Sequence, residues 1–193
     1  MKSLSILIII TVSILGKSLH DNDPDYKPGL LFRELKNLSG IEGFQLRELN
    51  ISDSLSEKNR INGKFYEVVS NEGKTYTVYI GRVNCCRAGG CREQQNAGFE
   101  TDFEYFDYFI LFDLQGKIIS VRVYNYAATH GQEITAKGWL NQFTGFDGTR
   151  DLRIGKEIDS ISGATISVHG LVADVKEKAA ILRKTELPYR LQE

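Results

Sequence analysis

The sequence predicts a single domain of the α+β class, an antiparallel sheet of hairpins with helices packed against it. Two pairs of segments rich in Tyr, Phe and Val are each joined by a glycine-containing turn, which is typical of β-hairpins. A segment with helical periodicity starts near Thr165, toward the C-terminus. Hydrophobic residues make up 41% of the 193-residue chain, which favours a folded domain over a disordered one.

The first residues of the chain predict a secretory signal peptide. Met1 and Lys2 precede an apolar run over residues 4–15. As a helix this run would span about 18 Å, too short for a hydrocarbon core of about 30 Å. Gly16 to Ser18 then offer a small-x-small cleavage site, so we expect a signal peptide over residues 1–18 and an exported protein. An uncleaved membrane anchor is the alternative.

Charge argues against a nucleic-acid partner. The chain has 24 Lys and Arg residues against 25 Asp and Glu residues. Removing Lys2 and Lys17 with the signal peptide leaves 22 basic residues and a net charge of −3. A domain that binds nucleic acid usually carries a basic excess, which this chain lacks.

Residues 19–63 predict an N-terminal lead-in to a main domain over residues 64–193. Residues 20–28 are polar and contain two of the three prolines, as a linker would. Residues 29–38 fit a short helix with leucines on one side, at positions 31, 35 and 38. Residues 41–51 have alternating features that fit either a strand or a loose helix.

Two hairpins follow, over residues 64–81 and 105–124. In the first strand of the second hairpin, one face would carry Phe106, Tyr108, Ile110 and Phe112, and the other Phe109 and Leu111. A strand that is apolar on both faces is typical of the centre of a sheet. These aromatic side chains could line a ligand site, but core packing is the expected role of most of them.

All three cysteines lie in residues 84–91, which we expect to form a loop between the two hairpins. In an exported protein this odd number allows one disulfide with a spare thiol, or an intermolecular link. Two glycines favour a Cys86–Cys91 pair, whereas a bridge between Cys85 and Cys86 would be strained. A zinc or iron–sulfur site that adds His130 to the three thiolates is the alternative, although paired Cys-x-x-Cys units are lacking.

The most informative stretch is residues 159–167, Asp-Ser-Ile-Ser-Gly-Ala-Thr-Ile-Ser, which immediately precede the apolar face of the long helical segment. A helix start presents unpaired N–H groups and a partial positive charge, so it favours an anion. Gly163 and Ala164 would let the anion approach the backbone, and Thr165 adds a hydroxyl. Helix capping by Ser162 or Thr165 is the alternative, but a single cap does not explain the whole cluster. These residues therefore form a candidate phosphate site.

This stretch resembles the flavinylation motif of the FMN-binding domain family, in which an acidic residue precedes Ser-Gly-Ala-Thr-x-Ser/Thr. The family includes the C subunit of the sodium-translocating NADH:quinone oxidoreductase and the G subunit of the RNF complex. The resemblance implies that Thr165 carries FMN through a phosphoester, installed by a flavin transferase that consumes FAD outside the cytoplasm. The implied site consists of Asp159, Ser162, Gly163, Ala164, Thr165 and Ser167. The three residues before Thr165 would surround the phosphate, while Asp159 and Ser167 would serve transferase recognition and loop shape.

Residues 127–145 resemble the second half of the family's site. The family has a Glu-Thr-Pro-Gly-Leu-Gly loop followed by a Trp and a Phe-x-Gly, matched here at Thr129, Gly131, Trp139, Phe143 and Gly145. The chain departs from this pattern at Ala128, His130, Gln132 and Glu133. The resemblance implies that Thr129, His130 and Gly131 lie at the flavin, and a polar loop residue is an equal explanation of His130.

Together these features predict an exported electron-transfer module with no catalytic residues of its own. Attachment through the phosphate leaves the isoalloxazine ring unmodified, so non-covalent surroundings would set its potential. Covalent attachment suits export, because FMN lost outside the cytoplasm would not readily be replaced. A membrane or extracytoplasmic redox protein is the expected partner. The alternatives are a flavin-dependent reductase, a non-covalent flavin- or ligand-binding module, and a structural secreted protein.

Overall fold

The computed structural model describes residues 23–39, 43–51, 62–70, 75–87 and 103–185. Three helices are present in these residues: α1 (Gly29–Ser39), α3 (Lys137–Leu140) and α4 (Thr165–Lys184). Two short 3-10 turns, η1 (Gln132–Thr135) and η2 (Asn141–Phe143), flank α3. The strands are β1 (Phe44–Leu49), β2 (Gly63–Ser70), β3 (Thr75–Arg87), β4 (Phe103–Phe112) and β5 (Ile118–Tyr126). None of the described helices is long and apolar enough to cross a membrane.

The five strands form one antiparallel sheet in the order β1-β2-β3-β4-β5, so each strand pairs with its neighbour in sequence. This confirms the predicted α+β class. Residues 44–49 form a strand, because β1 pairs along its length with β2. The lead-in therefore contributes a strand to the same sheet as the residues after position 63.

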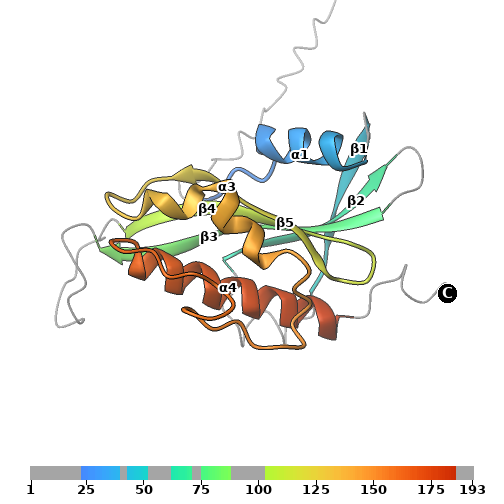
Figure 1. The fold of residues 1–193 in the computed structure, drawn as a ribbon. Helices are drawn as coiled ribbons and strands as arrows, with labels where there is room; N and C mark the ends of the chain where they lie inside the picture. The colour runs from blue at the N-terminus through green and yellow to red at the C-terminus, as the bar shows by residue number, and fades with distance from the viewer. Residues whose placement is uncertain (1–22, 40–42, 52–61, 71–74, 88–102, 186–193) are drawn as a thin grey trace, which may run out of the picture.

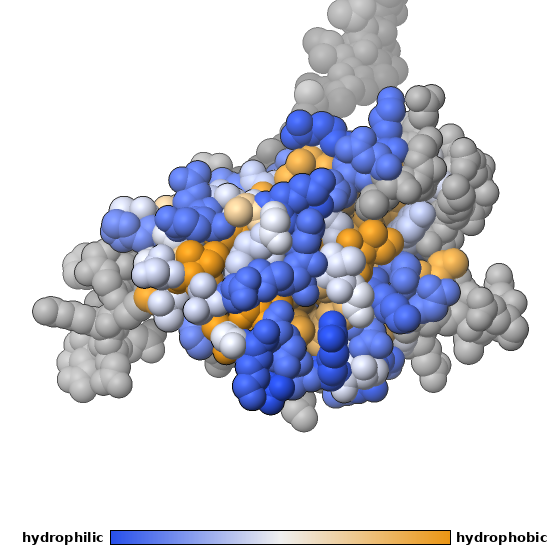
Figure 2. Space-filling view, viewed as in Figure 1, coloured by the Kyte–Doolittle hydropathy of each residue, from blue (hydrophilic) through white to orange (hydrophobic). Residues whose placement is uncertain are grey.

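Helices cover both faces of the sheet, with α1 on one side and α4 on the other (Figure 1). The larger core lies under α4 and contains the alternate β4 residues Phe106, Tyr108, Ile110 and Phe112. The smaller core lies under α1 and contains Phe109 and Leu111 of the same strand. The prediction that β4 is an interior strand with two apolar faces is confirmed. Hydrophilic side chains cover most of the face shown in Figure 2, with hydrophobic ones between them.

The segment before β1 is held on the sheet by polar contacts as well as by leucines. Leu31 and Leu35 of α1 are fully buried, as their spacing predicts. Glu34 accepts hydrogen bonds from the Arg122 guanidinium (2.6 Å) and the Ser120 hydroxyl (2.8 Å), both on β5. These contacts join α1 to the far edge of the sheet.

The structure corrects the predicted position of two cysteines. Cys85 and Cys86 belong to β3 and not to a loop between hairpins. The strand continues past Gly81 because β4 supplies pairing partners for it as far as Arg87, which pairs with Phe103. The expected Cys86–Cys91 disulfide lies outside what the structure describes, because only the backbone of Cys86 is described and Cys91 lies outside the described residues.

One irregularity in the β4–β5 pairing determines which faces of the sheet Tyr124 and Tyr126 lie on. Asp107 pairs with Asn125 and Tyr108 with Val123, so Tyr124 is an extra residue in β5. Such a bulge shifts the alternation of side chains along a strand by one position. As a result Tyr124 packs with the core under α1, while Tyr126, two residues later, packs with the core under α4.

Candidate functional site

The start of α4 is open to solvent and is not capped by a side chain. The helix begins at Thr165, its N-cap residue is Ala164, and no side-chain hydrogen bond caps it. The alternative in which Ser162 or Thr165 serves as a simple cap is therefore not realised in the described structure. The first-turn N–H groups have no partners inside a helix, so here they are available to an anion.

The predicted motif residues divide into an exposed group and a buried group. Asp159, Ser162, Gly163 and Thr165 are exposed, whereas Ala164 and Ser167 are buried. Gly163 has a φ of +83°, and a Cβ built on it would meet nothing within 4 Å. Glycine is thus favoured at this position by backbone conformation, and its open side leaves the backbone accessible.

The backbone of Asp159 is anchored by α3 and η2. The Trp139 indole N–H donates to the Asp159 carbonyl (2.9 Å), and the Asp159 N–H donates to the Gln142 side-chain oxygen (2.8 Å). Trp139 is 8% exposed and packs edge-on against the buried Phe143, with ring centroids 5.6 Å apart. Trp139 and Phe143 therefore support one end of the motif from the core while the Asp159 side chain stays exposed.

The loop of residues 127–131 lies against the other end of the motif. Gly131 has a φ of +91°, and a Cβ on it would lie 2.8 Å from the Tyr126 hydroxyl and 2.9 Å from Ser167 Oγ. Ala164 Cα would be 3.3 Å away. Both the conformation and the close approach require glycine at this position. The structure thus brings Gly131 together with Ala164 and Ser167.

The other two loop residues predicted at the site point their side chains outward. Thr129 and His130 are both exposed. The Thr129 hydroxyl donates a hydrogen bond to the Glu104 carboxylate on β4, and the His130 carbonyl accepts one from the Tyr126 hydroxyl. No group of three or more His, Cys, Asp and Glu residues in the described segments could hold a metal ion, and the alternative site that combines the three cysteines with His130 lies partly outside these segments.

Sequence reasoning missed two residues at this position, Tyr126 and Cys85. Ser167 Oγ lies 2.9 Å from the Tyr126 hydroxyl and 3.6 Å from Cys85 Sγ. Burial raises the pKa of both the Cys85 thiol and the Tyr126 hydroxyl, so both are protonated at neutral pH. No local sequence pattern predicts that either residue lies beside Ser167. The bulge in β5 brings Tyr126 there, and the length of β3 brings Cys85 there.

Comparison with known families identifies this region. Residues 106–180 match the family model described as FMN-binding domain. These residues belong to the FMN-binding domain family. The match runs from β4 into α4 and includes both the 127–131 loop and the 159–167 motif. No curated protein and no solved structure matches the chain. The family match supports FMN as the ligand.

The helix start of the FMN-binding domain fits a phosphate group. The exposed Thr165 hydroxyl, the uncapped first turn and the open side of Gly163 lie within four consecutive residues. Phosphate oxygens accept hydrogen bonds from backbone N–H groups and are favoured by the positive end of a helix dipole. The residues that would hold the phosphate are therefore those of the motif, with Ala164 packed on Gly131 beneath them.

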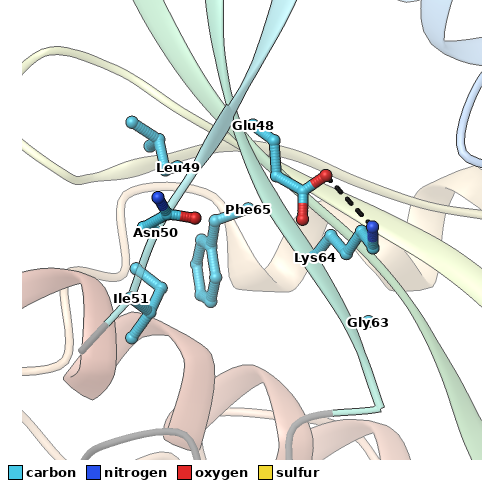
Figure 3. Close-up of a pocket in the computed structure, with 7 residues that line it drawn as sticks. All are labelled: Glu48, Leu49, Asn50, Ile51, Gly63, Lys64 and Phe65. Carbon is cyan, nitrogen blue, oxygen red and sulfur yellow. Dashed lines mark hydrogen bonds and ion pairs between the residues drawn. The ribbon is translucent and has the colours of Figure 1, made fainter. Parts of the chain in front are cut away.

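A separate cavity of about 210 Å³ lies at the edge of the sheet (Figure 3). Glu48 and Lys64 are hydrogen-bonded at 3.0 Å beside it. Its lining consists of Glu48, Leu49, Asn50, Ile51, Gly63, Lys64 and Phe65. It includes no residue of the 127–131 loop or the 159–167 motif, so it is not part of the predicted site.

Proposed function

We propose that this protein is an exported electron-transfer module that carries FMN through a phosphoester on Thr165. The observation that carries the proposal is the position of Thr165. Thr165 is an exposed, hydroxyl-bearing residue at the first position of an uncapped helix. It also lies within a Ser-Gly-Ala-Thr-x-Ser sequence and within the region that matches the FMN-binding domain. The N-terminal segment, with its signal-peptide features, supports export.

The attachment reaction would need FAD and a flavin transferase. The Thr165 oxygen attacks the phosphorus on the FMN side of the FAD pyrophosphate, and a threonine–phosphate ester bond forms. The phosphorus–oxygen bond to AMP breaks, AMP leaves, and the hydroxyl proton passes to solvent or to a transferase base. Negative charge on the phosphate oxygens would be stabilised by the first-turn N–H groups of α4.

The exposure of the motif residues supports different roles for them in the proposed attachment. The Asp159 and Ser162 side chains are exposed and can contact the transferase directly. Ser167 is 3% exposed, which favours a role in shaping the helix start over direct contact with the transferase. Bound FMN would supply the capacity to accept and pass on electrons. An exposed attachment point suits exchange with a membrane or extracytoplasmic redox partner by direct contact.

Flavin retention after denaturation tests this function. The full chain is produced with a flavin transferase and FAD, purified, denatured in guanidinium chloride and passed through a desalting column. We expect flavin absorbance to stay with the denatured protein, because a phosphoester survives unfolding. Flavin that separates from the protein would indicate a non-covalent binding module, and a colourless preparation would indicate a structural protein. Steady turnover of a small acceptor by the flavin-loaded protein would instead indicate a reductase.

A further inference from the structure

Each hydroxyl around Ser167 has one proton, which determines the donor and the acceptor in each of its hydrogen bonds. The Tyr126 hydroxyl has one proton and donates it to the His130 carbonyl. Toward Ser167 Oγ, at 2.9 Å, Tyr126 must therefore accept, and Ser167 must donate. The Ser167 oxygen is then left to accept from the Cys85 thiol, at 3.6 Å. The chain of donors runs from Cys85 to Ser167, Tyr126 and the His130 carbonyl.

This chain fastens the first turn of α4 to three other parts of the domain. Cys85 lies on β3, Tyr126 lies on β5, and the His130 carbonyl belongs to the 127–131 loop. Among the described residues, Tyr126 is the side chain that hydrogen-bonds to both the loop and the helix turn. Gly131 lies beside the Tyr126–Ser167 hydrogen bond, where a Cβ would come within 2.8 Å of the Tyr126 oxygen and 2.9 Å of the Ser167 oxygen.

We propose that Tyr126 is a positioning residue for the attachment of FMN to Thr165. Its hydroxyl holds the 127–131 loop against the first turn of α4. Through its hydrogen bond with Ser167, it also fixes the orientation of Thr165 in that turn. The inference rests on the proposed function. Displacing a reacting group by about 1 Å can slow a reaction by roughly 100-fold, so a modest loosening of this turn has a measurable effect.

The chain offers a matched control on the same strand. Tyr124 is also on β5, and its hydroxyl donates to the Asp25 carbonyl at 2.8 Å. Because of the bulge it lies on the opposite face of the sheet, with the core under α1. Tyr126→Phe and Tyr124→Phe therefore each remove one hydroxyl hydrogen-bonding group, but only Tyr126→Phe removes it at the helix start.

The first measurement is the rate of FMN attachment in vitro with purified transferase and FAD, followed by intact mass. We expect Tyr126→Phe to lower kcat by roughly tenfold, with the KM for the protein substrate unchanged, because the exposed recognition residues are untouched. Tyr124→Phe should react like the wild type. A Ser167→Ala substitution should also slow the reaction. The double variant with Tyr126→Phe should lose less rate than the two single fold-reductions multiplied together, because both substitutions break the same hydrogen bond. Equal rates for Tyr126→Phe and the wild type would overturn the proposal.

The second measurement is independent of flavin chemistry. Hydrogen–deuterium exchange is followed in peptides covering residues 127–133 and 164–168 of the unmodified protein. We expect faster exchange in both peptides for Tyr126→Phe, and wild-type exchange for Tyr124→Phe. Unchanged exchange in Tyr126→Phe overturns the positioning role. A wild-type protein that the transferase does not modify contradicts the proposed function, while the exchange result still decides whether Tyr126 holds the loop.

Discussion

Thr165→Val protein is expected to carry no covalently bound FMN, against full occupancy in the wild type. Valine keeps the shape of the threonine side chain and its branching at Cβ, but it has no hydroxyl to form the phosphoester. Because Thr165 is exposed and its side chain caps no helix, the fold should be retained. Intact mass after co-expression with a flavin transferase measures this directly, as the loss of an adduct equal to FMN less one water.

Two substitutions serve as controls for the loss of FMN. Thr144→Val alters another exposed threonine and should leave the adduct unchanged. Thr165→Ser keeps a hydroxyl at the attachment position and should retain measurable modification. An adduct of undiminished abundance in the Thr165→Val protein would rule out Thr165 as the attachment point.

Asp107→Ala is expected to lower the free energy of unfolding by about 3 kcal/mol, since it removes one partner of a buried ion pair. Asp107 is 2% exposed and accepts two hydrogen bonds from Arg82, at 2.6 and 3.1 Å, and one from Asn125 at 2.9 Å. The substitution leaves a buried guanidinium without this carboxylate. It also loosens the ends of β3, β4 and β5, where Cys85 and Tyr126 lie. Denaturant unfolding followed by circular dichroism measures the change.

Two control variants distinguish the stability lost by breaking the buried Arg82–Asp107 pair from that lost by removing any charge. Glu48→Ala breaks the exposed Glu48–Lys64 pair and should cost less than about 1 kcal/mol. The double variant Arg82→Met with Asp107→Leu removes both charges and should recover much of the loss. A cost for Asp107→Ala no larger than that of Glu48→Ala would show that the buried pair does not stabilise the fold.

Periodicity in the sequence was enough to predict the main elements of the fold. The apolar residues on both faces of β4 predict an interior strand, and the three- and four-residue spacing in α4 predicts a helix with one buried face. The structure contains this strand and this helix. Residues 41–51 could not be assigned, because a short stretch with partial alternation fits two periods. Pairing with β2, which is a tertiary contact, decides that residues 44–49 form a strand.

The contacts beneath the candidate site could not be predicted, because they depend on register. One extra residue at Tyr124 moves Tyr126 to the face under α4, and no turn or glycine signal marks that bulge. Likewise β3 extends to Arg87 only because β4 pairs with it, which places Cys85 beside Ser167. The 159–167 motif, in contrast, depends on local residue types and could be found without knowing the fold.

Peptide sequencing of the modified protein tests the attachment of FMN to Thr165 most directly. Trypsin cleaves after Lys156 and Lys176, which isolates residues 157–176 with all four hydroxyl candidates: Ser160, Ser162, Thr165 and Ser167. We expect fragment ions that place an FMN phosphoester on Thr165 and leave the three serines unmodified. Fragment ions that place the adduct on a serine, or a peptide 157–176 with no adduct after exposure to transferase and FAD, would contradict the assignment.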